Sequence, residues 1–206
     1  MTNNNNVIIP VIKVVFAGTT SVGKSSLINT YFGQPFDEYI YSTLYADYRI
    51  KKLDVDNKTY RIRIDDTSGS ERLRNMLRIT IRYCKIIVLV FDMTKKNSFL
   101  ELERILDLIF NEIGDKVSLV LIGNKSDCTD NFEIKEKEGI EFAKILNAPF
   151  YLSSAKENIE GFKQFFDDYL VDYIKKHRIE LENNAQQRVI PLNNRNRNRR
   201  HGAYNC

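Results

Sequence analysis

The sequence has few cysteines and no long hydrophobic segment. Its 206 residues include three cysteines, Cys84, Cys128 and Cys206, which lie far apart along the chain. An odd number of scattered cysteines does not indicate a disulfide framework or a zinc site. No apolar run approaches the roughly 18 residues that a membrane-spanning helix needs. The first residues, Met1-Thr2-Asn3-Asn4-Asn5-Asn6, lack the basic and apolar regions of a signal peptide. We therefore expect a cytosolic protein.

Acidic residues are absent from the C-terminal segment 188–206, which contains five arginines. Because the formal net charge is +4, the rest of the chain carries a net charge of −1. On charge grounds a basic tail suits an anionic membrane or RNA equally well. The asparagines between the arginines and the lack of an aromatic cluster argue against RNA. We therefore expect no nucleic-acid partner.

Apolar stretches of strand length alternate with stretches of helical pattern. The expected strands are residues 11–17, 47–55, 59–65, 86–91, 117–122 and 150–152. Such alternation predicts an α/β fold, with a mostly parallel six-stranded sheet and helices on both faces. The second and third strands are joined at Asp56-Asn57. That connection is too short for a crossover, so we expect one antiparallel hairpin.

Two helices have clear signals in the sequence. Ser98, with Glu101 three residues later, predicts a capping box at the start of one helix. A second pattern is an aromatic stripe at helical spacing, expected to pack on the sheet: Phe162, Phe165, Phe166, Tyr169, Leu170 and Tyr173. Residues 1–10 and 179–206 are expected to be disordered and flexible, which leaves one domain at 11–178.

The most informative motif directly follows the first expected strand. It is the run Gly18-Thr19-Thr20-Ser21-Val22-Gly23-Lys24-Ser25, which fits the phosphate-loop pattern G-x-x-x-x-G-K-[ST]. The stretch from Lys24-Ser25-Ser26 to Tyr31 is typical of a helix, and a helix N-terminus favours negative charge. The motif predicts a nucleoside triphosphate site, in which Lys24 reaches the terminal phosphates and the Ser25 hydroxyl meets Mg²⁺.

Two further residues are candidates for the metal site. Asp66 follows the third expected strand, and the carboxyl ends of parallel strands meet at one edge of a sheet. Its carboxylate is placed to hold Mg²⁺ opposite Ser25. Thr43 lies in the polar and aromatic loop before the hairpin. Its hydroxyl is expected to reach the metal only when a terminal phosphate is present, as in a switch.

Residues after the last two strands are candidates for recognition of the base. Asp127, in Gly123-Asn124-Lys125-Ser126-Asp127, has two acceptor oxygens that match the two adjacent donors of guanine. The ring acceptor of adenine would oppose the same carboxylate. The loop Ser154-Ala155-Lys156 follows the last strand and offers a backbone N–H, at Ala155, for the guanine carbonyl.

These motifs together resemble the Ras superfamily of small GTPases from about Val11 to Lys176, and its Rab-type members most closely. Ile64-Asp65-Asp66-Thr67-Ser68-Gly69-Ser70-Glu71-Arg72 is similar to the Rab pattern IWDTAGQER. Phe91-Asp92-Met93-Thr94, followed by Ser98-Phe99, is similar to YDVT…SF.

The resemblance implies roles for single residues. It implies that Phe36 lies against the guanine ring, that Ser25 and Thr43 ligate Mg²⁺, and that Gly69 donates its N–H to the γ-phosphate. It also implies that Lys125 braces the phosphate loop. The catalytic set would be Lys24, Thr43, Gly69 and the residue at position 70.

The chain departs from the Rab pattern at three positions. Ser70 stands where the family has the glutamine that orients the attacking water, and a serine is too short for that distance. Tyr45 replaces a glycine, and Asp65 replaces the tryptophan of a surface triad, which alters the partner surfaces. Asp65 and Asp66 are strand neighbours, so only one of them is expected to face the site.

The resemblance implies a monomeric GTP-binding switch in membrane trafficking, with effectors, an exchange factor and a GTPase-activating protein contacting residues 36–48 and 67–82. Prenylation of Cys206, with an unmodified thiol as the alternative, would place it on the cytosolic face of a membrane. A GTP-binding module with almost no hydrolysis and a Ras- or Rho-type signalling protein are also compatible with these motifs. A phosphate-loop kinase is less well supported, because no arginine-bearing lid is evident and Asp127 would have no role.

Overall fold

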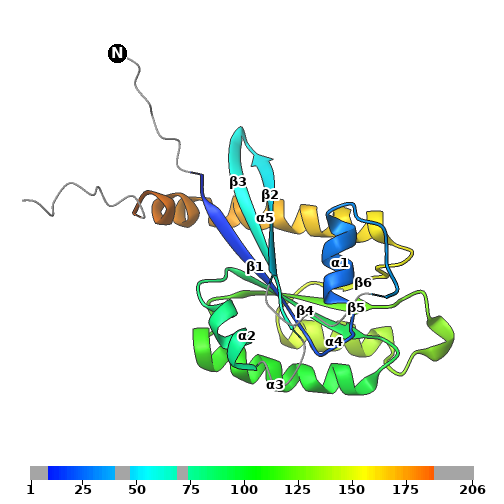
Figure 1. The fold of residues 1–206 in the computed structure, drawn as a ribbon. Helices are drawn as coiled ribbons and strands as arrows, with labels where there is room; N and C mark the ends of the chain where they lie inside the picture. Colours follow the sequence, from blue (N-terminus) through cyan, green and yellow to red (C-terminus); the bar gives the residue numbers. More distant parts are fainter. Residues whose placement is uncertain (1–8, 40–46, 69–73, 188–206) are drawn as a thin grey trace, which may run out of the picture.

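The computed structural model describes residues 9–39, 47–68 and 74–187. Its elements are β1 (Val11–Ala17), α1 (Lys24–Tyr31), β2 (Asp47–Val55), β3 (Lys58–Asp66), α2 (Arg74–Ile81), β4 (Ile86–Asp92), α3 (Lys96–Ile113), β5 (Ser118–Asn124), a short 3₁₀ turn (Thr129–Asn131), α4 (Glu136–Ile145), β6 (Phe150–Leu152) and α5 (Ile159–Gln187). The strands form one sheet in the order β2-β3-β1-β4-β5-β6 (Figure 1). The predicted α/β fold is confirmed.

The β2–β3 hairpin is the antiparallel part of the sheet, and the other strand pairs are parallel. Its turn is made by Asp56 and Asn57, which have φ values of 49° and 61°. Two successive residues in this left-handed region match the right-handed twist of the paired strands, and Asp and Asn tolerate it better than most side chains. The predicted hairpin is therefore confirmed at the expected position.

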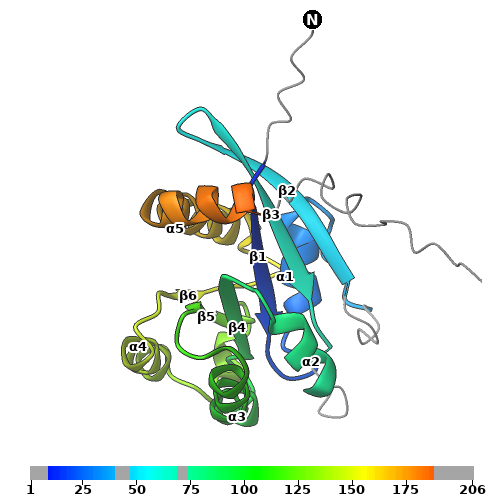
Figure 2. The ribbon, with the colours of Figure 1, turned by 90° about the vertical axis from the view of Figure 1, so that its left-hand side faces the viewer.

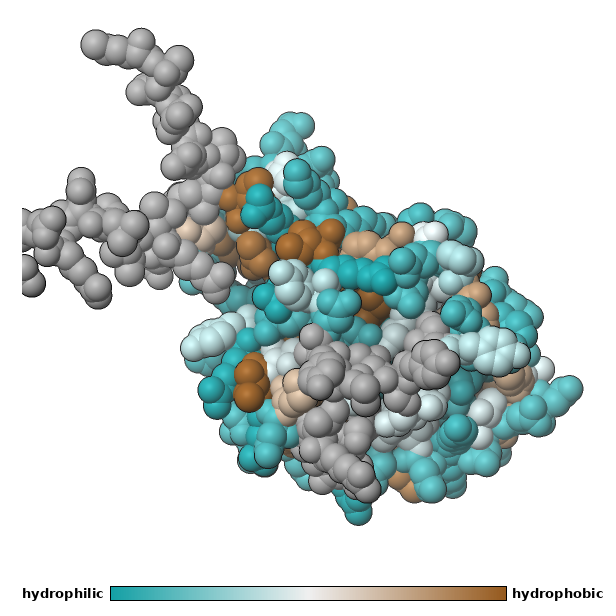
Figure 3. All heavy atoms as spheres, in the orientation of Figure 1, coloured by the Kyte–Doolittle hydropathy of each residue, from teal (hydrophilic) through white to brown (hydrophobic). Residues whose placement is uncertain are grey.

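Helices cover both faces of the sheet (Figure 2). Because strand side chains alternate between the two faces, Val14 and Phe16 of β1 join the core beneath α1 and α5, while Val15 and Ala17 join the core beneath α2, α3 and α4. The surface shown in Figure 3 is mainly hydrophilic over the described residues, with hydrophobic residues in small groups. None of the helices in the described ranges is long and apolar enough to span a membrane.

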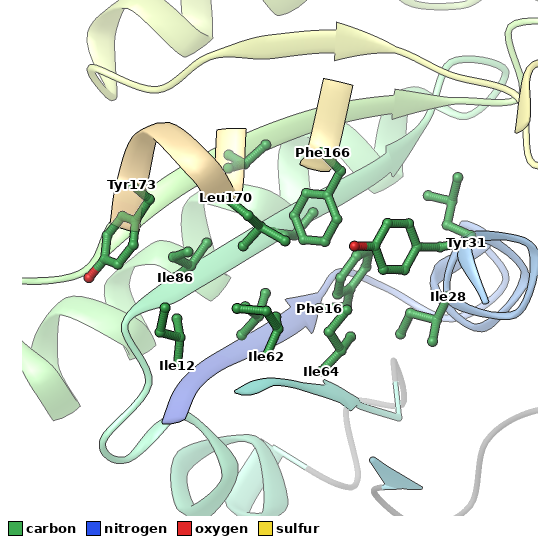
Figure 4. Packing of buried hydrophobic residues seen from close by; sticks show 14 of the residues in the cluster. Ile12, Phe16, Ile28, Tyr31, Ile62, Ile64, Ile86, Phe166, Leu170 and Tyr173 are labelled. Carbon is green, nitrogen blue, oxygen red and sulfur yellow. The ribbon is translucent and has the colours of Figure 1, made fainter. Parts of the chain in front are cut away.

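The aromatic stripe of α5 packs on the sheet, as predicted. Phe162, Phe166 and Leu170 have no exposed surface. The ring of Phe166 meets Phe16 of β1 edge-on at 5.8 Å between centroids and Tyr31 of α1 at 5.2 Å (Figure 4). Each edge-to-face aromatic pair stabilises the fold by roughly 0.5–1.5 kcal/mol beyond the contribution from burying the two rings. The stripe therefore fixes α1 and α5 against the strand that leads into the phosphate loop.

Two helix ends differ from the sequence predictions. The capping box predicted at Ser98 is wrong, because α3 begins at Lys96 and the Ser98 hydroxyl bonds to backbone atoms of Asp92 and Lys95 instead. Helix α5 continues beyond residue 178, where the sequence predicts the start of the tail. In this last part Leu181 is buried, and Glu182 pairs with Lys58 at 2.7 Å, which ties the helix to the β2–β3 hairpin.

Candidate nucleotide-binding site

The phosphate loop, residues 18–23, joins the buried strand β1 to α1 and needs its two glycines. A Cβ on Gly18 would lie 2.2 Å from the backbone oxygen of Val90, and one on Gly23 would lie 2.2 Å from Nδ2 of Asn124. Gly23 also has a φ of 96°, which other residues rarely adopt. The loop therefore sits directly against β4 and β5. A larger residue would clash with the backbone of Val90 at position 18 and would displace the side chain of Asn124 at position 23.

Lys24 is held over this loop by its own backbone. Its Nζ donates hydrogen bonds to the carbonyl oxygens of Gly18 at 2.9 Å and Thr19 at 2.8 Å. Burial lowers the pKa of Lys24 to about 8, although the charge of Asp66 acts in the opposite direction. A buried ammonium that donates to two carbonyls favours an anionic ligand, since opposite charge restores its protonated form.

Ser25 and Asp66 bring a hydroxyl and a carboxylate together beside the loop. Register pairs Asp66 of β3 with Phe16 of β1, and the Ser25 Oγ donates a hydrogen bond of 2.6 Å to Asp66 Oδ2. Asp65 faces the other side, where Arg63 pairs with it at 2.6 Å. Only Asp66 therefore faces the phosphate loop, as expected for neighbours in a strand.

Asn124 links three parts of the site. Its Nδ2 donates a hydrogen bond of 2.8 Å to the carbonyl of Val22 in the phosphate loop. Its Oδ1 accepts one of 3.2 Å from the backbone N–H of Ala155, in the loop after β6. Asn124 is 2% exposed, so these bonds are shielded from water. The amide thus fixes the loop of residues 154–156 relative to the phosphate loop.

Asp127 lies in the loop that follows β5 and is oriented by Ser154, whose Oγ donates a hydrogen bond of 2.6 Å to Oδ1. The same Oγ accepts bonds from the backbone N–H groups of Lys156 and Glu157 at 3.1 and 3.0 Å. Partial burial acts to raise the pKa of Asp127, but the hydrogen bonds from Ser154, its own backbone and Cys128 lower it overall. The carboxylate is therefore held ionised in one orientation.

A comparison with models of protein families matches residues 13–175 to the Ras family. The chain belongs to the Ras family. As a small GTPase of this family it is a GTP- and GDP-binding protein of the kind that hydrolyses GTP, typically with Mg²⁺, and interacts with effectors and regulators. The match begins in β1 and ends in α5, so it includes the complete six-stranded sheet apart from the first two residues of β1.

The donor set at Ser25 and Asp66 fits the metal that these small GTPases use. Mg²⁺ prefers oxygen ligands and binds proteins through one or two side chains together with phosphate oxygens and water. The hydroxyl and carboxylate, 2.6 Å apart beside the phosphate loop, supply such oxygens. Within the described ranges, no group of three or more His, Cys, Asp or Glu residues is placed to hold a metal ion, so the protein oxygens at this site are those of Ser25 and Asp66.

The other predicted residues of the GTPase site take these positions. Ser26 lies in the first turn of α1, while Thr20, Ser21 and Lys156 are exposed. Phe36 is half-buried and packs against the core beneath α1 and α5. Thr43, Gly69, Ser70 and Cys206 lie outside the described residues, as do parts of the predicted partner surfaces 36–48 and 67–82.

Sequence reasoning missed Asp92, a fully buried carboxylate at the end of β4. Its Oδ2 lies 2.7 Å from Nζ of Lys125, and its Oδ1 accepts hydrogen bonds from the backbone N–H and hydroxyl of Thr94. Asn124 also donates a bond to the phosphate loop, and the bracing role that the resemblance implies for Lys125 stays a prediction. The position of Asp92 at the end of an apolar strand was the signal that could have found it.

Proposed function

We propose that this small GTPase is a Rab-like molecular switch that distinguishes GTP from GDP and acts in membrane trafficking. The observation that carries the proposal is the ionised Asp127, oriented by Ser154 and joined through Asn124 and Ala155 to the phosphate loop. A carboxylate fixed in this way matches the two donors of guanine. We assign the base contacts to Asp127, Ala155 and Phe36, and the phosphate contacts to Gly18–Ser26.

The proposed metal ligands are Ser25, Thr43 and Asp66. Bound Mg²⁺ would neutralise charge on the terminal phosphates. Lys24 contributes its ammonium to the same phosphates, and the backbone N–H of Gly69 binds the γ-phosphate. The γ-phosphate thus holds the segments around Thr43 and Gly69, and its loss releases them, which is how partners read the bound nucleotide.

Hydrolysis is proposed to be slow because Ser70 replaces the water-orienting glutamine. Thr20 adds to this effect, since its side chain in the phosphate loop occupies space that an incoming arginine of an activating protein needs. Such an arginine is worth about 10³–10⁵ in rate. A GTP-binding module with almost no hydrolysis is the second candidate, favoured by the same Ser70, and single-turnover hydrolysis separates the two.

Attachment to a membrane is proposed through prenylation of Cys206 and the five arginines of residues 188–206. One lipid chain binds membranes only marginally, and each arginine adds about 1 kcal/mol near anionic lipid. Intact-mass measurement of the protein isolated from its native cells tests this, since an unmodified mass excludes the anchor. We further propose that the GTP-binding domain, expected at 11–178, includes the rest of α5 that packs on it, and that the segment after α5 carries the anchor.

The nucleotide that co-purifies with the protein tests the main proposal. Chromatography of the nucleotide released on denaturation should show GTP or GDP, and bound GTP would also indicate slow hydrolysis. Competition against a fluorescent GDP analogue should show displacement by GTP and none by ATP at the same concentration. Displacement by ATP with the same affinity would exclude the proposed function.

A further inference from the structure

Cys128 is the residue after Asp127, and its side chain turns back toward the carboxylate. The thiol Sγ lies 3.3 Å from Asp127 Oδ2 and donates a hydrogen bond to this oxygen. The other oxygen, Oδ1, accepts the bond of 2.6 Å from the hydroxyl of Ser154. Asp127 and Cys128 are both half-buried. The carboxylate is thus held by one side-chain donor on each of its two oxygens.

The thiol of Cys128 is fixed by the turn in which it lies. The backbone N–H of Cys128 donates a hydrogen bond to the carbonyl of Lys125 at 3.1 Å, and its own carbonyl accepts one from the N–H of Asn131 at 3.0 Å. The hydrogen bond to Asp127, followed by partial burial and the charge of the same carboxylate, raises the pKa of Cys128. The thiol is therefore protonated at neutral pH and retains the hydrogen that it donates.

The two donors restrain the carboxylate from different loops. Ser154 lies after β6, whereas Cys128 lies after β5 in the same loop as Asp127. One donor restrains one oxygen and leaves the carboxylate plane free to turn, because the terminal torsion of an aspartate is broad. A donor on each oxygen restrains the plane itself. Each oxygen has two acceptor positions, so both oxygens can still accept a hydrogen bond from a base.

We propose that Cys128 is a positioning residue for guanine recognition, whose thiol holds Oδ2 of Asp127 so that both carboxylate oxygens face the two donors of the base. The inference rests on the proposed function, because it takes Asp127 as the residue that binds guanine. It extends that function to a residue outside the phosphate loop and the expected base contacts. Cys128 acts through the carboxylate, so its loss should be felt most by ligands that use both oxygens.

A comparison of two bases separates this role from general support of the loop. Guanine has a ring N–H and an adjacent exocyclic amine, whereas hypoxanthine, the base of inosine nucleotides, has the ring N–H without the amine. A two-point contact requires one orientation of the carboxylate plane, while a one-point contact tolerates rotation. Loss of the thiol should therefore weaken binding of GDP more than binding of inosine diphosphate.

Two variants of similar size test this difference. Cys128→Ala removes the donor, and Cys128→Ser keeps a donor at the same position. Each full-length protein is titrated with GDP and with inosine diphosphate in competition with a fluorescent GDP analogue. Cys128→Ala should weaken GDP binding by roughly three- to tenfold, as expected for the loss of one modest hydrogen bond, and inosine diphosphate binding by less than about twofold. Cys128→Ser should stay within about twofold of the native protein for both nucleotides.

A second comparison asks whether the effect passes through the carboxylate. In Asp127→Asn the amide oxygen should stay with the hydroxyl of Ser154, the stronger donor, so the amide nitrogen faces the thiol and cannot accept its hydrogen. Adding Cys128→Ala to this variant should therefore change the affinity for xanthosine diphosphate by less than about twofold. The difference between the two backgrounds measures the coupling between residues 127 and 128.

Several results would overturn the inference. Equal losses of GDP and inosine diphosphate binding in Cys128→Ala would show that the thiol supports the loop as a whole. Equal losses in Cys128→Ala and Cys128→Ser would show that the size of the side chain matters and the donor does not. An equal effect of Cys128→Ala in the native and Asp127→Asn backgrounds would place its action outside the carboxylate. The melting temperature of each variant identifies any loss that comes from unfolding.

Failure of the proposed function would give a different result. In that case GDP would not bind to the native protein, or Asp127→Asn would bind it unchanged. If GDP bound natively and depended on Asp127, but Cys128→Ala kept the native affinity for GDP, the positioning role of Cys128 alone would be excluded. Ser154 would then be sufficient to fix the carboxylate.

Discussion

Ser154 and Asp127, which lie in different loops 27 positions apart, are joined by a hydrogen bond of 2.6 Å from the serine Oγ to the carboxylate Oδ1. Ser154 is 1% exposed, and its hydroxyl is itself fixed by two backbone N–H groups. A carboxylate held by a buried and fixed donor loses little entropy when a ligand binds, so its two acceptor oxygens are ready for a base with two donors.

The first prediction concerns this carboxylate. Asp127→Asn should weaken GTP binding by roughly 2–4 kcal/mol, or about thirty- to a thousand-fold, because it removes a charged two-donor contact. Preference should shift toward xanthosine nucleotides, whose ring carbonyl accepts a hydrogen bond from the new amide. Competition titrations with both nucleotides measure the change. Asp130→Asn, the same change at an exposed residue nearby, is the control. Unchanged GTP affinity in Asp127→Asn would remove Asp127 from the base site.

The second prediction follows from the pKa of Lys24, which burial lowers to about 8 in the nucleotide-free protein. A bound phosphate raises this pKa, because the opposite charge favours the ammonium. At any pH at which Lys24 is neutral in the free protein, binding of the nucleotide is therefore accompanied by uptake of a proton. The affinity for GDP should be constant below about pH 7.5 and fall by up to roughly tenfold per pH unit above pH 8.

Titration with a fluorescent GDP analogue between about pH 7 and pH 9.5 measures this dependence. Lys24→Arg is the control, because arginine stays protonated throughout this range. Its affinity should be lower but independent of pH. If the arginine variant showed the same decline as the native protein, the decline would belong to another group.

Much of this fold could be predicted from spacing alone. Local patterns reveal features that depend on residues close in the sequence. These include the lengths of the strands, the turn at Asp56-Asn57 and the stripe that contains Phe162 and Phe166. The start of α3 could not be predicted in this way. The hydroxyl of Ser98 looks like a cap, but in the fold it bonds to the end of β4.

Within the site, the phosphate loop and Asp127 have sequence signatures, but their supports do not. The bond from Asn124 to Val22 spans 102 positions, so it depends on how the strands pack and not on residues close in the sequence. Asp92 stands at a recognisable strand end, but its partner Lys125 follows the next strand, so their ion pair could not be predicted from the sequence. Contacts between distant segments follow from the packing of the sheet, which a single sequence does not display.

A third prediction tests a support of the hairpin. Lys51 of β2 has its Nζ 2.7 Å from both carboxylate oxygens of Asp167 in α5, and the buried hydroxyl of Tyr31 donates to the same carboxylate. Asp167→Ala leaves the phenol and the ammonium without this acceptor, at a cost of about 1–3 kcal/mol. For a domain of this size each kcal/mol lowers the melting temperature by about 2–4 °C.

The neighbouring residue Asp168 offers the matched control, since it is exposed on the same helix. Asp168→Ala should leave the melting temperature nearly unchanged, and both variants should still bind GDP. Thermal unfolding followed by circular dichroism measures the difference. Equal melting temperatures for the two variants would show that the Lys51–Asp167 pair does not stabilise the fold.

The last prediction concerns the rate of hydrolysis and position 70. With serine in place of the water-orienting glutamine, intrinsic turnover should be on the order of 10⁻⁴ s⁻¹ or less. Ser70→Gln should raise single-turnover hydrolysis severalfold and leave GTP affinity nearly unchanged, because the side chain acts on water and not on the bound nucleotide. Release of phosphate from preloaded protein measures the rate. Ser70→Ala serves as the control and should be as slow as the native protein, since the serine hydroxyl is too short to take part. A glutamine variant no faster than the alanine variant would show that some other feature of the chain limits hydrolysis.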